Sequence, residues 1–289
     1  FEFQPGSDAT VDVVIQDPGE IGIATESPQG YIQISDKYVI CNTFTSAGIN
    51  AAIDALGSGG GEVYLPEGTY NISASVTIDY NNTTLRGAGK GTVLQLTGGV
   101  NCINLNGKSY ITIKDLQVDG NSQNGFPIFG GAGTSHCVLE NLYLHGSNYC
   151  GIKFDTGGGA SIDNNKIVNC DVGIKFSNSN LSIVNINEIT TSPTSLTGIG
   201  ILFDPIEGGE AGENRIIVGT IHNLAIGVKF AENNTRFAEG NYIIGGIYYN
   251  SQYGIYIGAD TDAKWNTFIV GLDQDGAGGQ EILDEAGNN

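Results

Sequence analysis

A tetrapeptide that recurs along the second half of the chain brings lysine and aspartate side chains to matching positions. Copies of Gly-Ile-Lys-Phe, or close variants of it, start at Gly151, Gly173, Gly200, Gly227 and Gly254. If each copy is a strand and the strands stack in register, alternate residues point outward. The outward row is then Lys153, Lys175, Lys229 and Tyr256, interrupted by Leu202, with Asp155 and Asp204 two residues further along on the same face.

This row, called here the lysine stripe, has two interpretations. In the first, it is a groove for an anionic sugar chain, in which Asp155, Asp204 and Lys175 supply acid–base chemistry or an aspartate holds Ca²⁺. In the second, it is a solvated face on which each lysine pairs with a neighbouring acid. The spacing of the residues predicts the row itself and leaves both interpretations open.

Other residues with chemical potential form weaker patterns. Asp273 and Asp275 resemble part of a Ca²⁺-binding loop but lack its full set of ligands. No cofactor is therefore expected, and Ca²⁺ is the one candidate. Asp115 and Asp119 are four residues apart on one predicted strand and should share a face. Five N-x-S/T sequons are candidate glycosylation sites, at Asn71, Asn81, Asn82, Asn180 and Asn233.

The repeat itself predicts the fold. Its glycines are 22, 27, 27 and 27 residues apart, and a second series of asparagines runs in phase with them. That series comprises Asn141, Asn165, Asn187, Asn214, Asn241 and Asn266. Each repeat holds short strands rich in Ile and Val and no helical pattern, which is typical of one coil of a parallel β-helix. We therefore predict an all-β, single-stranded right-handed parallel β-helix, a solenoid of about nine coils. Glycines and asparagines are expected at its corners, where positive φ is wanted, and the asparagines can bond from coil to coil.

The N-terminal region predicts two further elements. Residues 45–56 have the spacing of an amphipathic helix, with Ile49, Ile53 and Leu56 on one face, which would cap the first coil. Residues 1–28 lie outside the repeat and contain strand-like segments, so they are expected to form an arm that contacts another subunit. The β-helix is expected to span residues 29–289. Because its C-terminal coil has no evident cap, the arm of one molecule could pair with the last coil of another, giving head-to-tail association.

Composition excludes several classes of protein. The net charge of −19 repels phosphate backbones, so nucleic-acid binding is not expected, and no run of about 18 apolar residues predicts a membrane span. The chain has no methionine, which together with the sequons favours an extracellular or cell-surface protein after removal of a signal peptide. Five cysteines without C-x-x-C spacing are predicted to be buried thiols, with a Cys150–Cys170 disulfide left open.

The N-terminal part of the chain resembles a known superfamily. The segments AAIDALGSGGGEVYLPEGTYNIS and TLRGAGKGTVLQL, between Thr45 and Leu96, are similar to the N-terminal signature of the pectate-lyase-like right-handed parallel β-helix proteins. That superfamily includes secreted polysaccharide lyases, polygalacturonase relatives, viral tailspikes and non-catalytic adhesins. The polygalacturonase motifs N-T-D, D-D, G-H-G and R-I-K are not found in this sequence.

Two functions follow from the fold and the resemblance. The first is a secreted, non-catalytic β-helix that forms or decorates an extracellular surface structure, as a fibre subunit, appendage or adhesin. The second is a polysaccharide lyase or glycoside hydrolase that acts on acidic glycans along the lysine stripe. The missing catalytic motifs favour the first function, so the chain is expected not to be an enzyme.

Overall fold

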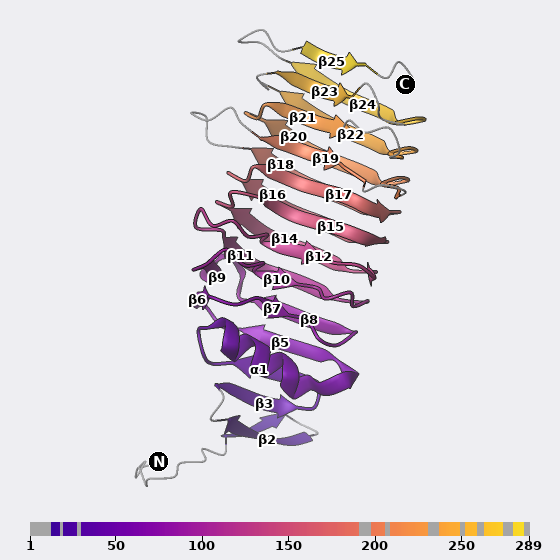
Figure 1. Ribbon diagram of the computed structural model, residues 1–289. Helices are drawn as coiled ribbons and strands as arrows, with labels where there is room; N and C mark the ends of the chain where they lie inside the picture. Colours follow the sequence, from indigo (N-terminus) through magenta and orange to yellow (C-terminus); the bar gives the residue numbers. More distant parts are fainter. Residues whose placement is uncertain are drawn as a thin grey trace.

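The chain winds into a β-solenoid of about nine turns with mostly parallel strands (Figure 1). The computed structural model describes residues 13–17, 20–27, 30–190, 198–205, 209–230, 237–248, 252–258, 263–273 and 280–285. Within these ranges the strands form two sheets, of 15 and 10 strands, that run along the rod. The predicted fold class is therefore confirmed.

The 10-stranded sheet holds the recurring tetrapeptide. Its strands are β7 (Val76–Thr77), β10 (Ile103–Asn104), β12 (Ile128–Gly130), β13 (Thr134–Ser135), β15 (Cys150–Gly158), β17 (Val172–Asn180), β19 (Ile199–Phe203), β21 (Ile226–Phe230), β23 (Tyr253–Ile257) and β25 (Gln280–Asp284). Ile152 pairs with Ile174 and Phe154 with Phe176, all four fully or almost fully buried. The predicted stacking of one repeat on the next is thus confirmed.

The 15-stranded sheet begins antiparallel and continues parallel. Its first part comprises β1 (Val13–Asp17), β2 (Glu20–Ser27), β3 (Tyr31–Ser35), β4 (Tyr38–Cys41), β5 (Gly61–Leu65), β6 (Gly68–Ile72), β8 (Thr83–Gly87) and β9 (Thr92–Leu96). It continues through β11 (Thr112–Asp119), β14 (Val138–His145), β16 (Ser161–Val168), β18 (Ile183–Thr190), β20 (Arg215–His222), β22 (Tyr242–Tyr248) and β24 (Thr267–Asp273).

The long strands of this sheet bend, so that each coil has three faces. The first half of β11 pairs with β8 and its second half with β9. The bend is at Asp115, where φ is +56°, and it recurs at Asn141 (+54°) and Asn164 (+52°). We call this row the strand bend, the half before it the first half-face and the half after it the second half-face. Asp115 therefore lies at the bend and Asp119 on the second half-face, so the expectation of one shared face is wrong.

The N-terminal helix caps the solenoid as predicted. Helix α1 (Ser46–Leu56) starts after Thr45, whose hydroxyl oxygen accepts a hydrogen bond from the Gly48 amide. Its buried face includes Ile49, Ile53 and Leu56, at the lower end of the rod in Figure 1. Two short 3-10 turns, η1 (Gly57–Gly59) and η2 (Gly89–Gly91), complete the described helices. Burial of this apolar face shields the first coil's core from water.

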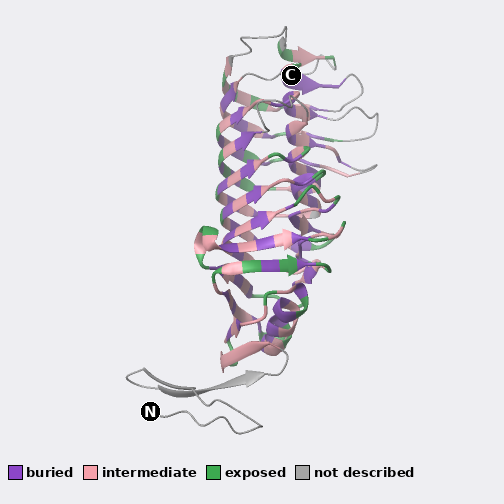
Figure 2. Ribbon diagram, turned by 90° about the vertical axis from the view of Figure 1, so that its left-hand side faces the viewer, coloured by how far each residue is buried: buried purple, intermediate pink, exposed green. Residues whose placement is uncertain are grey.

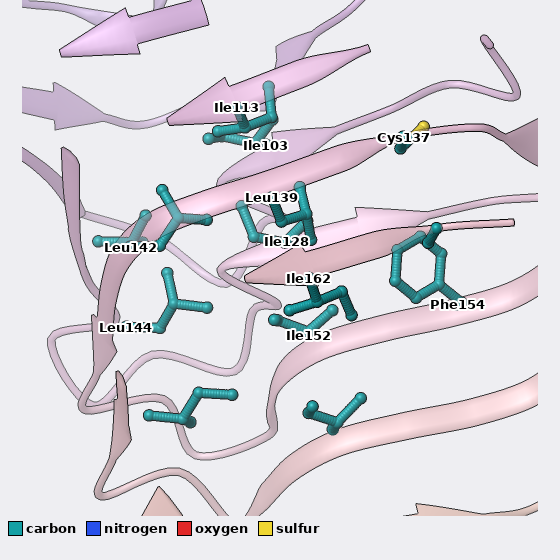
Figure 3. Packing of buried hydrophobic residues seen from close by; sticks show 14 of the residues in the cluster. Ile103, Ile113, Ile128, Cys137, Leu139, Leu142, Leu144, Ile152, Phe154 and Ile162 are labelled. Atoms are coloured by element: carbon teal, nitrogen blue, oxygen red, sulfur yellow. The ribbon is translucent and has the colours of Figure 1, made fainter. Parts of the chain in front are cut away.

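A continuous hydrophobic core runs through the coils. Inward Ile, Leu, Val and Phe side chains alternate with outward polar ones, which gives the banded burial pattern of Figure 2. In Figure 3, Ile113, Leu139 and Ile162 from the large sheet meet Ile103, Ile128 and Ile152 from the small one. Such close packing makes each coil depend on its two neighbours.

The repeated glycines have a different role from the one predicted. Gly173 lies inside β17, and a Cβ built on it would meet the Gly200 carbonyl oxygen at 2.5 Å and Ile189 Cγ2 at 2.6 Å. Gly200 meets the Gly227 carbonyl oxygen at 2.5 Å in the same way. These glycines allow close packing between coils, and the expectation that they supply positive φ at corners is wrong for them.

The asparagines form two separate ladders, not the single series predicted. The exposed ladder runs along the strand bend, from Asn187 to Asn164 to Asn141 to Asp115. The buried ladder joins Asn214, Asn241 and Asn266, each amide bonding to the next at 3.0 Å. Asn165 belongs to neither ladder, because its buried amide bonds to the backbone at Leu139 and Leu142. A one-residue difference in register therefore decides whether an asparagine is buried or exposed.

The five cysteines are free and buried, which confirms the thiol interpretation and leaves no Cys150–Cys170 disulfide. Burial raises the pKa of the Cys41 and Cys137 thiols to about 11 and that of Cys170 to about 12. Because the thiolate is the reactive form, these side chains act as small core residues.

Candidate functional site

The lysine stripe forms in the register expected from the sequence. Lys153 pairs with Lys175, Lys175 with Leu202, Leu202 with Lys229, and Lys229 with Tyr256, on consecutive strands of the 10-stranded sheet. Asp155 and Asp204 lie beside the row, so the predicted residues are brought together.

The charges of the stripe are largely satisfied within it. The Lys153 ammonium is 2.7 Å from Asp155 and lies over the rings of Phe126 and Phe129, at 5.1 and 5.4 Å. The Lys175 ammonium is 2.5 Å from Asp204. Each pair holds its own counter-charge, which reduces the field that the stripe offers to an anionic ligand.

The C-terminal end of the stripe is also engaged. The Lys229 ammonium lies 5.1 Å from the ring centroid of Tyr256, a cation–π contact. Tyr256 is only 8% exposed, and its hydroxyl donates a hydrogen bond to Glu285. Its ring therefore belongs to the packed surface of the stripe and offers little area for a sugar.

The remaining sequence candidates are scattered over the molecule. Asn71, Asn81 and Asn82 are exposed, Asn180 is half-buried, and Asn233 lies outside the described residues. Asp273 ends β24, and Asp275 lies outside the described residues. In the part of the chain that the structure describes, no three His, Cys, Asp or Glu side chains are placed to hold a metal ion.

A pocket that sequence reasoning missed lies on the other sheet, along the strand bend. It has a volume of about 360 Å³ and opens to solvent. It is lined by Gly89, Lys90, Asp115, Asn141, Leu142, Tyr143, Asn164, Lys166 and Asn187. The side chains come from η2 and from β11, β14, β16 and β18, so four successive coils and one turn build it. We call it the bend pocket.

Aromatic and cationic groups meet in the bend pocket. The Lys90 ammonium lies 5.6 Å from the ring centroid of Tyr143, and Lys166 is the residue paired with Tyr143 on the next coil. Among the described residues, no carboxylate lies within 4 Å of the Lys90 ammonium, whereas Lys166 is 2.5 Å from Glu188. The exposed ladder adds amide donors and acceptors along the same edge. Such a surface can stack a ring on Tyr143 and bind an anion at Lys90.

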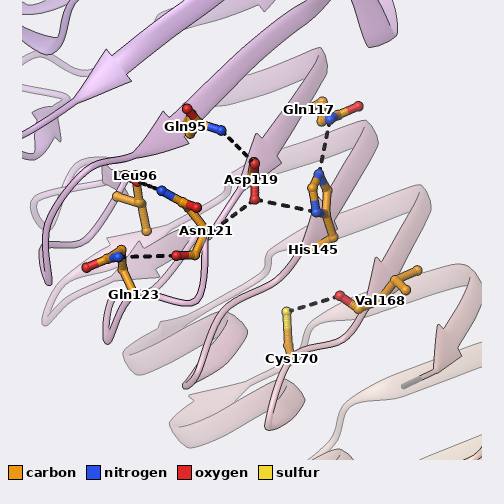
Figure 4. A network of polar contacts seen from close by, with 9 residues as sticks. All are labelled: Gln95, Leu96, Gln117, Asp119, Asn121, Gln123, His145, Val168 and Cys170. Atoms are coloured by element: carbon orange, nitrogen blue, oxygen red, sulfur yellow. Dashed lines mark hydrogen bonds and ion pairs between the residues drawn. The ribbon is translucent and has the colours of Figure 1, made fainter. Parts of the chain in front are cut away.

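A polar network on the second half-face adjoins the pocket (Figure 4). His145 Nδ1 is 3.6 Å from an Asp119 carboxylate oxygen, and its Nε2 is 3.0 Å from the Gln117 amide. Gln95 donates to the other Asp119 oxygen at 2.9 Å. The His145 ring also lies 4.9 Å from that of Tyr143, so the network holds the wall of the bend pocket in place.

Two charged residues and a histidine form a second cluster further along the same half-face. Glu188 accepts from Lys166 and lies 3.2 Å from His222 Nε2. Partial burial by itself would raise the pKa of Glu188, but hydrogen bonds from Lys166 and His222 outweigh it, so the pKa is lowered.

This cluster predicts how stability depends on pH. A carboxyl group with a lowered pKa contributes stability above its ordinary pKa of 4.5, and that contribution is lost as the pH falls through the lowered value. In Lys166→Met the main partner is missing, so stability should fall less between pH 5 and about pH 3. Urea unfolding curves at stepped pH measure this, with Lys108→Met as the control. An equally steep acid loss in both variants would contradict it.

The pocket was missed because its residues are far apart in sequence and share no motif. A signal was nonetheless present, since Tyr143 follows Asn141 by two residues and Lys166 follows Asn164 by two. The two spacings match only when Asn164, and not Asn165, is aligned with Asn141.

Comparisons with known proteins agree with this architecture. The profile of a family described as "Right handed beta helix region" matches residues 101–269, more than half of the chain. A second, "Rhamnogalacturonase A/epimerase, pectate lyase-like", matches residues 41–110. A comparison with curated protein sequences found no significant match. Among the described helices, none is long and apolar enough to cross a membrane.

Three solved structures align with this chain. ORF18 of Geobacillus virus E2 superposes with a TM-score of 0.53 at 14% identity, over 78% of this chain and 58% of that one. The A-module of the mannuronan C-5 epimerase AlgE6 from Azotobacter vinelandii gives 0.38 at 18%, over 82% and 93%. The alginate lyase from Paenibacillus sp. str. FPU-7 gives 0.43 at 14%, over 86% and 100%.

The chain thus spans less than two thirds of the viral protein it matches. At these identities the likeness concerns the fold alone. The coiled architecture, the family profile over its central coils and the pectate-lyase-like profile over its first coils lead to one conclusion: the chain belongs to the right-handed β-helix family of the pectate-lyase-like superfamily.

Proposed function

We propose that this chain is a non-catalytic β-helix that binds an acidic glycan and forms or decorates an extracellular surface structure. The observation that carries the proposal is the bend pocket, in which Tyr143 lies between Lys90 and Lys166 beside a ladder of amides. Aromatic rings stack on the apolar faces of sugars, amides bond to hydroxyl groups, and ammonium groups bind carboxylates.

The negative charge of the protein makes Lys90 important for binding an anionic polymer. On a chain with a net charge of −19, an anionic polymer is repelled over most of the surface. Lys90, which has no carboxylate within 4 Å among the described residues, is then a place where a uronate carboxylate gains more than at a paired lysine. The paired lysines of the stripe offer less, because Asp155 and Asp204 already neutralise Lys153 and Lys175.

A second candidate function is cleavage of the glycan by a polysaccharide lyase or hydrolase. The catalytic residues expected from the sequence are Asp155, Asp204 and Lys175. Of these, Asp204 and Lys175 form an ion pair with each other. One observation on the other sheet also favours it: His145 lies next to Tyr143 with Nδ1 3.6 Å from Asp119, so a histidine and a carboxylate that could serve as a general base and its partner are neighbours. Binding is the simpler function for a pocket that opens to solvent.

The remaining predictions about the context stay proposals. Exposed sequons at Asn71 and Asn81 support an extracellular, glycosylated protein, and the hairpin of β1 and β2 on β3 supports an arm able to pair end to end. Mass spectrometry of the native protein and electron micrographs of concentrated material test these two points.

Binding is tested with polygalacturonate and alginate as probes and neutral dextran as the reference. We expect the two uronate polymers to bind and dextran to bind at least tenfold more weakly. The double variant Lys90→Ala/Tyr143→Ala should weaken uronate binding tenfold or more, since about 1.4 kcal/mol corresponds to one factor of ten. The matched control is Lys153→Ala/Phe129→Ala, which removes a similar cation–aromatic pair from the lysine stripe.

Three outcomes count against the proposal. If the control pair abolishes binding and the pocket pair does not, the stripe is the glycan site. If neither uronate polymer binds, the protein is not a receptor for acidic glycans. If the unmodified protein produces unsaturated or reducing chain ends, and His145→Ala or Asp155→Ala does not, the protein is an enzyme.

A further inference from the structure

An apolar surface covers the first half-face in the C-terminal coils. It consists of Leu181, Ile183, Ile217, Ile244, Trp265 and Ile269, and we call it the apolar outer face. Trp265 is 77% exposed, Leu181 61%, Ile183 57% and Ile269 55%. Large exposed apolar side chains gathered on one face of a soluble protein mark a site of association.

The change along one outward row is abrupt. From coil to coil, this row contains Lys114, Glu140, Asp163, Asn185, Ile217, Ile244 and Ile269, paired in register. It is charged or polar in the first four coils and isoleucine in the last three. Since the core is on the opposite side of the same strands, burial within this chain does not explain the three isoleucines.

The two ends of the apolar outer face are corner residues of the coil. Leu181 (φ +57°) and Trp265 (+56°) occupy the corner position before β18 and before β24. The same corner is left-handed on the other coils as well, at Tyr110, His136, Gly159, Glu213 and Gly240, so the turn belongs to the fold and the choice of side chain does not. Here it turns two large apolar side chains toward solvent, where they gain nothing unless something covers them.

We propose that the apolar outer face is the interface of a side-by-side dimer, in which a second copy of this chain packs on it with the two rods antiparallel. The partner must present rows with the same spacing between coils, about 4.8 Å, for flat sheet faces to interdigitate along the axis. A second copy meets this requirement by construction.

The face is complementary to itself in this arrangement. A two-fold axis parallel to the strands, between β20 and β22, places the β18 coil against the partner's β24 coil and β20 against its β22. Leu181 then faces the partner's Trp265, and Ile217 faces the partner's Ile244. Arg215, the one formal charge at the outward positions of the first half-face in these four coils, faces the ring of the partner's Tyr242 as a cation–π pair. Every contact occurs twice, as a closed two-fold interface requires.

The dimer interface is distinct from the glycan site: the two share only the β18 coil, where Asn187 lines the bend pocket and Ile183 lies on the first half-face. It also differs from end-to-end pairing, which would produce an open series of sizes instead of one closed species. Failure of either proposal therefore leaves the other standing.

Sedimentation velocity over a range of concentrations tests the dimer on the full chain. We expect one dimeric species that dissociates on dilution. Ile183→Lys/Ile244→Lys should raise the dissociation constant at least a hundredfold. The matched control is Val138→Lys, which changes an outward residue two coils before Ile183 in the same row and should leave the dimer intact. All variants are expected to fold, because the changed side chains point outward. Thermal unfolding followed by circular dichroism checks this.

Cross-linking then tests the predicted geometry. An equimolar mixture of Leu181→Cys and Trp265→Cys should form covalent dimers on mild oxidation, and either variant alone should not. The native thiols do not interfere, because all five are buried. A monomer at every concentration would overturn the proposal, as would a dimer that the lysine double variant leaves unchanged. Cross-linking of Leu181→Cys alone would contradict the antiparallel arrangement.

Discussion

Replacing Phe203 with alanine will lower the free energy of unfolding by about 3–5 kcal/mol. The Phe203 ring is fully buried between Phe176 and Phe230, with ring centroids 5.5 and 4.7 Å away. Its removal leaves a cavity in the middle of a stack, and the neighbouring coils cannot close it without losing their own strand pairing. Denaturant unfolding and calorimetry measure the loss.

Leu202 is the matched control for this substitution. It is adjacent in the same strand but points outward in the lysine stripe and is half-buried. Leu202→Ala should therefore cost about 1 kcal/mol or less. Equal losses at positions 202 and 203 would show that the alternation of inward and outward residues is wrong in this coil.

The second large effect concerns the buried ladder. Asn241 is fully buried and makes four hydrogen bonds through its side chain. Its oxygen accepts from the backbone and side-chain amides of Asn214, and its nitrogen donates to the Ala211 carbonyl and to Asn266. Asn241→Ala leaves several of these groups buried without partners, so we expect a loss of about 2–5 kcal/mol.

The exposed ladder supplies the control for that variant. Asn187 donates to Asn164, but its side chain is exposed, so water can replace the lost partner. Asn187→Ala should cost less than about 1 kcal/mol. Hydrogen exchange of the Asn214 amide gives a second readout: its protection should fall in Asn241→Ala and stay unchanged in Asn187→Ala. A small loss in both variants would mean that water already reaches the buried ladder.

The pairing of Lys153 with Lys175 shows how much of the structure the repeat predicts. Two copies of Gly-Ile-Lys-Phe place the inward Ile and Phe residues without ambiguity, and matching outward residues follow because side chains alternate along a strand. What the outward residues contact depends on side-chain conformations and on neighbouring coils. The ion pairs of Lys153 and Lys175 therefore had to be seen in the structure.

The asparagines show where reading by sequence fails. Asn164 and Asn165 are adjacent, and spacing alone does not decide which of them joins the ladder. The strand bend turns Asn164 outward and Asn165 inward, and a shift of one residue exchanges the two faces. The bend pocket depends on this register, so it could not be found before the ladder was placed.

By itself, the sequence determined the β-helix, its capping helix, the stacked core and the order of the lysine stripe, because these follow from local periodicity repeated from coil to coil. The tertiary structure alone decided which side chains from different coils meet: the ion pair of Lys175 with Asp204, the bend pocket around Tyr143 and the apolar outer face. The reason is physical, since contacts between coils join residues more than 20 positions apart, and their register is set by packing against the core.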